Sequence, residues 1–153
     1  MISRHSLGIA LALLAVSASR APGQDTDAAL TAAIRSYAPE MALSSDPGLV
    51  HAADFNGDGR QDVAAVLVGG GKSALVIFNG TRSGYQAHAL YAVLPAGPWQ
   101  LNVVPPGRHR ILGPEGAVEI SSPAVELVFP GRSSAMYAWG GNRYQVYGTE
   151  NYH

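Results

Sequence analysis

The sequence predicts an α+β fold: one N-terminal amphipathic helix packed on an antiparallel β meander of five or more strands, forming a sheet, a sandwich or a partial, propeller-like unit. Apolar residues recur at three- and four-residue steps between residues 30 and 41, which is the period of a helix with one buried face. Short apolar or alternating runs follow between residues 49 and 147, and turn residues separate them. The 18 glycines and 10 prolines favour turns and strands over long helices.

Length and composition suit a single globular domain. The 153 residues are 47% hydrophobic and 14% charged, which is enough apolar material for one core. The formal net charge is -1 and no basic stripe is present, so nothing in the sequence indicates a nucleic-acid partner. The chain has no cysteine, so it can form neither a disulfide nor a lipoprotein anchor, and its stability must come from the core.

Residues 1–24 resemble a secretory signal peptide. Arg4 and His5 precede an apolar stretch over residues 7–16, which is the usual order of such a signal. The stretch is shorter than the roughly 20 apolar residues that cross a bilayer. We therefore expect export to the periplasm or the cell exterior, with no transmembrane segment after cleavage.

The cleavage site follows from small residues. Val16 and Ala18 occupy the positions three before and one before a cut after Ala18, as a signal peptidase requires. We expect cleavage there, and a cut as late as Gln24 stays open. The mature chain would then be a single β-rich domain over residues 25–153.

The first predicted element is the helix. Asp25–Asp27 offer side-chain oxygens and negative charge for a helix start. Pro39 ends or kinks the helix, because proline cannot donate to the helical ladder. A single apolar stripe must lie on other elements, so we expect this helix to cover the strands that follow. The stripe consists of Leu30, Ala33, Ile34, Tyr37 and Met41.

Four runs then predict the first strands. Residues 49–53 lead into an acidic loop, and residues 63–68 lead out of it with no polar residue on either face. The second run is therefore predicted to be a central strand covered on both sides. A glycine-rich turn leads to residues 74–78, and an Asn-Gly turn leads to the alternating run over residues 85–91.

The second half of the chain predicts more strands. Residues 95–116 are rich in proline and glycine, and they suggest short strands with a long loop. Residues 136–139 and 144–147 flank a Gly-Gly-Asn turn, so they predict a terminal hairpin with aromatic cross-strand pairs. Between these regions, Glu119 and Glu126 are predicted to project outward from two facing strands of one hairpin.

The acidic loop has the spacing of a calcium site. Ca²⁺ takes six to eight oxygen ligands, and short Asp and Asn side chains on alternate residues can surround it. Gly59 stands at loop position 6, where a sharp turn is needed, whereas Ala65 replaces the glutamate of an EF-hand at position 12. Asp62 must then close the site. The predicted ligands are the side chains of Asp54, Asn56, Asp58 and Asp62 and the carbonyl of Arg60.

These residues also carry a family resemblance. The stretch over residues 49–68 resembles the FG-GAP and VCBS-type repeats, whose loops read D-x-[DN]-x-D-G-x-x-D between two strands. The resemblance implies a structural Ca²⁺ held by the five ligands named above. It covers one copy of the repeat, whereas a propeller needs several. The alternative is an exposed Asp/Asn/Gly turn that binds no ion.

Two functional classes follow. The first is a non-enzymatic, exported β-rich module with one structural Ca²⁺, which binds an unknown protein or envelope component. The second is a small hydrolase of envelope polymers that uses Glu119 and Glu126, or an acid of the loop, as its acid and base. The first class needs only features that the sequence contains, whereas the second also needs a cleft.

Overall fold

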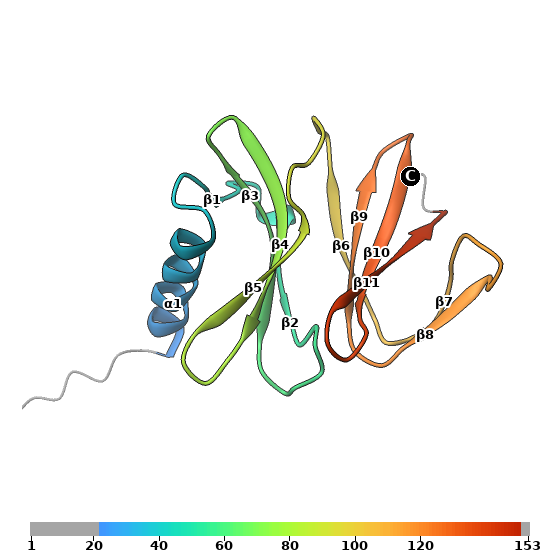
Figure 1. Cartoon of the computed structure of the whole chain (residues 1–153), viewed down its shortest axis with the longest axis horizontal. Coiled ribbons are helices and arrows are strands. Elements are labelled where there is room, and N and C mark those ends of the chain that lie inside the picture. Colours follow the sequence, from blue (N-terminus) through green and yellow to red (C-terminus); the bar gives the residue numbers. More distant parts are fainter. Residues whose placement is uncertain (1–21, 151–153) are drawn as a thin grey trace, which may run out of the picture.

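The computed structural model describes residues 22–150, and it describes side chains from Asp27 onward. The chain forms four layers, which Figure 1 shows from left to right: the helix α1, a sheet of β1 to β5, a sheet of β6 and β9 to β11, and the hairpin β7–β8. The predicted signal peptide falls on residues 1–21, outside the described residues, and on the first residues of α1.

The elements have the following bounds. They are α1 (Pro22–Tyr37), β1 (Ala42–Leu43), the 3-10 helix η1 (Pro47–Leu49), β2 (Val50–Ala53), β3 (Asp62–Gly69), β4 (Lys72–Gly80), β5 (Tyr85–Tyr91), β6 (Gln100–Val104), β7 (Gly107–Arg110), β8 (Ala117–Ile120), β9 (Ala124–Phe129), β10 (Ser133–Trp139) and β11 (Tyr144–Thr149).

The first sheet is antiparallel and has β3 near its centre. Its order is β1-β3-β4-β5, and β2 also pairs with β3, alongside β1. Ala64 and Val66 of β3 pack in the core between the two large sheets, whereas Ala65 and Leu67 pack in a core under α1. Both faces of β3 are therefore covered, which confirms the prediction from its apolar run.

The second sheet has the order β11-β10-β9-β6 and is also antiparallel. Met136 pairs with Tyr147 and Trp139 with Tyr144, so the predicted terminal hairpin is confirmed. The hairpin β7–β8 covers the outer face of this sheet through a smaller apolar cluster. The members of that cluster that are buried are Ile120, Ala124, Met136 and Ala138.

The predicted α+β class and its antiparallel strands are confirmed. The helix ends before Pro39, one of the two effects predicted for that proline, but the predicted start at Asp25 and the helical position of Met41 are wrong. The helix ends at Tyr37 and not at Met41, because the residue before Pro39 disfavours helical backbone angles. It begins at Pro22 and not at Asp25, and proline is favoured at the first position of a helix. Among residues 22–150, no helix is long and apolar enough to cross a membrane.

The predicted hairpin with Glu119 and Glu126 on facing strands is also wrong. Glu119 lies in β8, which pairs with β7, and Glu126 lies in β9, which pairs with β6 and β10. The turn at residues 121–123 takes the chain from one sheet to another. Only Glu119 is exposed, whereas Glu126 is 4% exposed: it lies on the face that the β7–β8 hairpin covers, and it lines one hollow with residues of β7 and with Thr149 of β11.

Candidate functional site

The predicted calcium loop connects β2 to β3 and is anchored in the core by Phe55. The Phe55 side chain is fully buried in the apolar cluster between the two large sheets. Its carbonyl oxygen accepts a 2.9 Å hydrogen bond from the Ser122 hydroxyl, which lies on the turn between β8 and β9. The loop is therefore held against both sheets, although no local pattern in the sequence indicates either contact.

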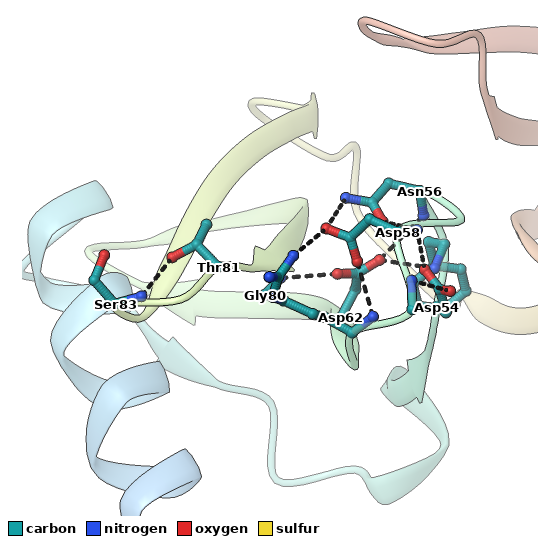
Figure 2. A network of polar contacts seen from close by, with 10 residues as sticks. Asp54, Asn56, Asp58, Asp62, Gly80, Thr81 and Ser83 are labelled. Carbon is teal, nitrogen blue, oxygen red and sulfur yellow. Dashed lines mark hydrogen bonds and ion pairs between the residues drawn. The ribbon is translucent and has the colours of Figure 1, made fainter.

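Asp62 closes the loop through backbone hydrogen bonds. Its side chain is fully buried, and Oδ2 accepts hydrogen bonds from the N–H groups of Phe55 at 2.7 Å and Asn56 at 3.1 Å. Its Oδ1 accepts a third, of 2.8 Å, from the N–H of Gly80 at the end of β4 (Figure 2). One carboxylate thus joins the start of the loop, the start of β3 and the end of β4.

The outer part of the loop is stabilised by short-range bonds to side-chain oxygens. Asp54 accepts hydrogen bonds from the N–H of Asp58 at 3.0 Å and of Gly59 at 2.8 Å. Asn56 Oδ1 also accepts one of 3.1 Å from the Asp58 N–H, and Asp58 accepts one of 2.8 Å from the Arg60 N–H. Figure 2 shows the side chains of Asp54, Asn56, Asp58 and Asp62 gathered on this loop.

Glycine is required at one turn of the loop. Gly59 has a φ of +83°, a left-handed conformation that costs other residues steric strain. This is the glycine that the calcium-loop spacing places at position 6, so the backbone there has the sharp turn that the spacing predicts.

The two best-connected carboxylates of the loop have opposite electrostatic surroundings. The backbone N–H of Arg60 lowers the pKa of the exposed Asp58 carboxyl, and Asn56 and the Arg60 guanidinium add to the effect. Burial raises the pKa of the Asp62 carboxyl, although the N–H groups of Gly80, Asn56 and Phe55 oppose this shift. Asp58 is therefore the better candidate for an ionised ligand of a cation. The Asp62 carboxyl, by contrast, is buried away from solvent.

The donor chemistry of the loop fits calcium. An ionised carboxylate offers about four lone-pair sites. Hydrogen bonds use two of these sites on Asp54 and three each on Asp58 and Asp62, so each keeps at least one. All donors are hard oxygens, which Ca²⁺ prefers.

The geometry of the loop is less complete than its chemistry. Within residues 22–150, no group of three or more His, Cys, Asp or Glu side chains is arranged to hold a metal ion. The carboxylates of Asp54, Asp58 and Asp62 therefore lie in one loop without converging on a common centre.

The loop is connected to a cluster of aromatic side chains between the sheets. The Tyr144 hydroxyl of β11 donates a 2.6 Å hydrogen bond to Oδ1 of Asn79, the neighbour of Gly80 in β4. The rings of Tyr144 and Trp139 contact the imidazole of His88 edge-to-face, with centroids 5.6 and 5.8 Å away. The predicted aromatic hairpin contains Trp139 and Tyr144, but no local pattern indicates that His88 joins them.

The two candidate catalytic glutamates do not form a site together. Glu126 accepts a 2.7 Å hydrogen bond from the Thr149 hydroxyl and a 3.4 Å one from the Asn102 amide. Thr149 in turn shares a 2.7 Å hydroxyl contact with Ser134. Glu119 lies opposite Arg108 in the separate hairpin. Glu126 thus belongs to a polar network on the second sheet.

Comparisons with protein-family models, curated proteins and solved structures give no match for this chain.

Proposed function

We propose that this chain is a non-enzymatic, exported β-rich module whose loop over residues 54–62 binds one structural Ca²⁺. The observation that carries the proposal is the loop itself: oxygen side chains at alternate positions, a glycine in a left-handed turn and a firm anchor in the core. In this role the ion stabilises the junction between the two sheets. The partner of the module is a protein or another component of the cell envelope.

The side chains in the outer part of the loop, which are half-buried or exposed, are the ones that would adapt to the ion. Asp54, Asn56 and Asp58 are tied by hydrogen bonds within the loop, and the Arg60 carbonyl would complete this set of oxygens. Short side chains can rotate toward a cation without moving the core. Asp62 keeps its bonds to the backbone and can add one oxygen, so it would close the site from the buried side.

The affinity should be modest, because no glutamate supplies two oxygens at once. Extracellular modules of this kind bind Ca²⁺ with dissociation constants on the order of 10⁻⁴ to 10⁻³ M. At a free concentration about tenfold above the dissociation constant, binding adds about 1.4 kcal/mol to the free energy of unfolding. A gain of this size is a measurable fraction of the stability of a small domain.

Thermal melts in calcium and in EDTA test the proposal. The wild type should melt several degrees higher in about 10 mM calcium than in EDTA. Asp58→Asn keeps an oxygen for the Arg60 N–H but removes a charge, so it should abolish most of that difference. Glu115→Gln is the matched control, because it removes a carboxylate at an exposed site outside the loop, and it should keep the full difference.

Two outcomes would overturn the calcium site. One is a wild type that melts at the same temperature in both buffers. The other is Asp58→Asn that retains the whole calcium effect. In either case the loop is an acidic turn held by its own hydrogen bonds.

Export has a separate test. N-terminal sequencing of the native protein should find a first residue between Ser19 and Asp25, in a fraction outside the cytoplasm. An intact Met1 on a cytoplasmic product would contradict export and would leave the calcium result unaffected.

A further inference from the structure

The edge strand β5 has no charge or proline to prevent pairing with another chain, and the one irregularity in its pairing with β4 lies near its end, where the register shifts between Val76–Ala89 and Leu75–Tyr91. It is the last strand on one side of the first sheet, and among the described residues it pairs only with β4. Its seven residues, Tyr85–Tyr91, include no Asp, Glu, Lys, Arg or Pro. Natural proteins commonly place charges or proline on an exposed edge, or they keep it short or covered.

The other edges of the two large sheets are shorter than β5 and, on β6 and β11, partly occupied by other contacts. β1 and β2 have two and four residues. On β6, the Leu101 carbonyl oxygen lies 2.8 Å from Nε2 of His51, which links that edge to β2. On β11, the Gly148 carbonyl accepts a 2.8 Å hydrogen bond from the N–H of Leu112. Within the described part of the chain, β5 is therefore the longest edge strand, and its edge has the fewest other contacts among those compared.

Backbone groups of β5 point outward at alternate positions. The N–H of Thr81 donates to the Gly84 carbonyl at 2.8 Å, so these two residues form a hydrogen-bonded pair at the β4–β5 turn. Hydrogen-bonded and non-hydrogen-bonded pairs alternate along an antiparallel ladder. Counting from the turn through the observed register, Ala87 and Ala89 fall at positions whose N–H and C=O groups face away from β4.

A hollow lies on each face of the sheet beside this edge. On the helix side, a hollow of about 380 Å³ is lined by Ala29, Ala32 and Ala33 of α1 and by Tyr85 and Ala87. On the opposite side, a hollow of about 420 Å³ lies between β5 and the second sheet. Its lining includes His88, Leu90, Tyr137, Arg143, Tyr144 and Val146.

This arrangement suits a strand added to the edge. Successive side chains of a strand point to opposite faces, so an added strand would place them alternately near the two hollows. In such complexes the backbone bonds supply affinity and the alternating pockets supply specificity. Val146 is 63% exposed at the second hollow, so apolar surface is available there.

Charge and polarity indicate which strand fits. Arg143 is the one Asp, Glu, Lys or Arg side chain that lines either of the two hollows. The second hollow also contains His88, whose Nε2 is buried without a hydrogen-bond partner among the described residues. Burial lowers the pKa of His88, so the imidazole is neutral at neutral pH. The helix-side hollow contains only small or uncharged side chains.

We propose that β5 binds an extended peptide segment of a partner protein as an added strand. The segment has apolar side chains toward α1 and an acidic side chain toward Arg143. The proposal rests on the binding-module part of the proposed function and is independent of the calcium site.

A second copy of the chain fits this edge less well than a peptide. α1 packs against β5, so two copies paired through β5 would bring their helices close together across the symmetry axis. Neighbouring strands lie about 4.8 Å apart, whereas packed helices need about 8–10 Å between their axes. A single extended segment brings no helix with it.

A labelled peptide tests the proposal. The probe has nine residues, alternates threonine with valine and carries glutamate in place of the central threonine. Fluorescence anisotropy should show saturable binding to the mature chain. A peptide with proline in place of a valine beside the glutamate should bind at least about tenfold more weakly, because proline removes a backbone donor.

Two protein variants locate the site. Ala89→Pro blocks an outward N–H without removing a bond to β4, so it should weaken binding at least about tenfold, whereas Ala89→Thr should not. Arg143→Glu should reverse the preference between the glutamate peptide and its lysine counterpart. Arg132→Glu, on the β9–β10 turn, is the matched control and should keep the original preference.

Several results would overturn the proposal. They are the absence of saturable binding, equal binding by folded Ala89→Pro, and an unchanged peptide preference in Arg143→Glu. If Ala89→Pro does not fold, the test rests on whether Arg143→Glu reverses the preference between the glutamate and lysine peptides. A dimer of the wild type that Ala89→Pro dissociates would instead assign this edge to a second copy. Peptide titrations are made both in calcium and in EDTA, so that the outcome for the β5 edge does not depend on whether the loop binds calcium.

Discussion

Asp62 accepts a 2.8 Å hydrogen bond from the backbone N–H of Gly80, and this bond joins the start of β3 to the end of β4 (Figure 2). The same carboxylate accepts hydrogen bonds from the N–H groups of Phe55 and Asn56. The loop and the β4–β5 hairpin are therefore one connected unit. The buried charge is tolerated because three backbone donors face it.

Asp62→Asn should destabilise the protein even without calcium. An amide offers one acceptor oxygen and two N–H donors, so in either orientation at least one backbone N–H would face a donor. A buried donor left unsatisfied costs about 1–3 kcal/mol. Urea unfolding in EDTA at neutral pH measures this loss.

The matched control for Asp62→Asn is Glu115→Gln, which makes the same change of charge at an exposed position. We expect it to alter the free energy of unfolding by less than about 0.5 kcal/mol. If Asp62→Asn is equally mild, the three backbone bonds do not hold the loop closed.

Gly80→Ala should also destabilise the protein, through steric contact. A Cβ at Gly80 would clash with the carbonyl oxygen of Gln61, which is backbone and cannot rotate away. Such overpacking typically costs about 1–3 kcal/mol. Gly148→Ala is the matched control, because its nearest neighbour, a Leu112 side-chain carbon, would lie at an ordinary contact distance of 3.4 Å. Equal stability of the two variants in urea unfolding would contradict the close approach at Gly80.

Tyr144→Phe probes the bond that joins the two large sheets. The Tyr144 hydroxyl donates at 2.6 Å to Oδ1 of Asn79, which is 4% exposed. Removal of the hydroxyl leaves this acceptor unsatisfied, so we expect a loss of about 1–3 kcal/mol in urea unfolding.

Tyr147→Phe is the control for this bond. Its hydroxyl donates at 2.7 Å to Gln145 two residues away, in an exposed position. Water can replace that bond, so the loss should stay below about 0.5 kcal/mol. Similar losses of unfolding free energy for the two variants would mean that the inter-sheet hydrogen bond stabilises the protein no more than the exposed one.

Local patterns predicted much of the fold because the corresponding contacts are local. The apolar run in β3 indicates a doubly covered strand, and the turn after Trp139 indicates the hairpin that pairs it with Tyr144. Helical spacing alone did not locate the helix end, since Met41 is buried in the core below α1 although it lies beyond Pro39.

Distant contacts explain what the sequence could not predict. Asp62 appears in a calcium-loop pattern, yet its observed bonds depend on Gly80, 18 residues away. The Ser122 bond to the Phe55 carbonyl spans 67 residues. Glu126 alternates with apolar residues as a solvated side chain does, but the β7–β8 hairpin covers that face of the sheet. No local pattern in the sequence records which layer will cover a given strand.

The last prediction concerns pH and His88. Burial lowers the pKa of its imidazole below the usual value of 6.5, and the Asp62 carboxylate opposes the shift only partly. Between the folded and unfolded pKa values, the unfolded chain binds more protons, so stability rises with pH there. The stability that depends on neutral His88 is thus fully present above about pH 6.5 and is lost as pH falls toward the folded pKa.

His88→Phe tests this dependence, because it keeps a ring against Trp139 and Tyr144 but cannot be protonated. The hollow beside the imidazole is lined by Tyr137, Tyr144 and Arg143. The positive charge of Arg143 disfavours protonation of His88. Urea unfolding at several pH values between 5 and 7.5, in EDTA, should show the wild type losing more stability than the variant as pH falls. Since all other titrating groups are shared, they cancel in the difference between the two proteins. A difference that stays constant over this range would show that His88 is as easily protonated in the folded chain as in the unfolded one.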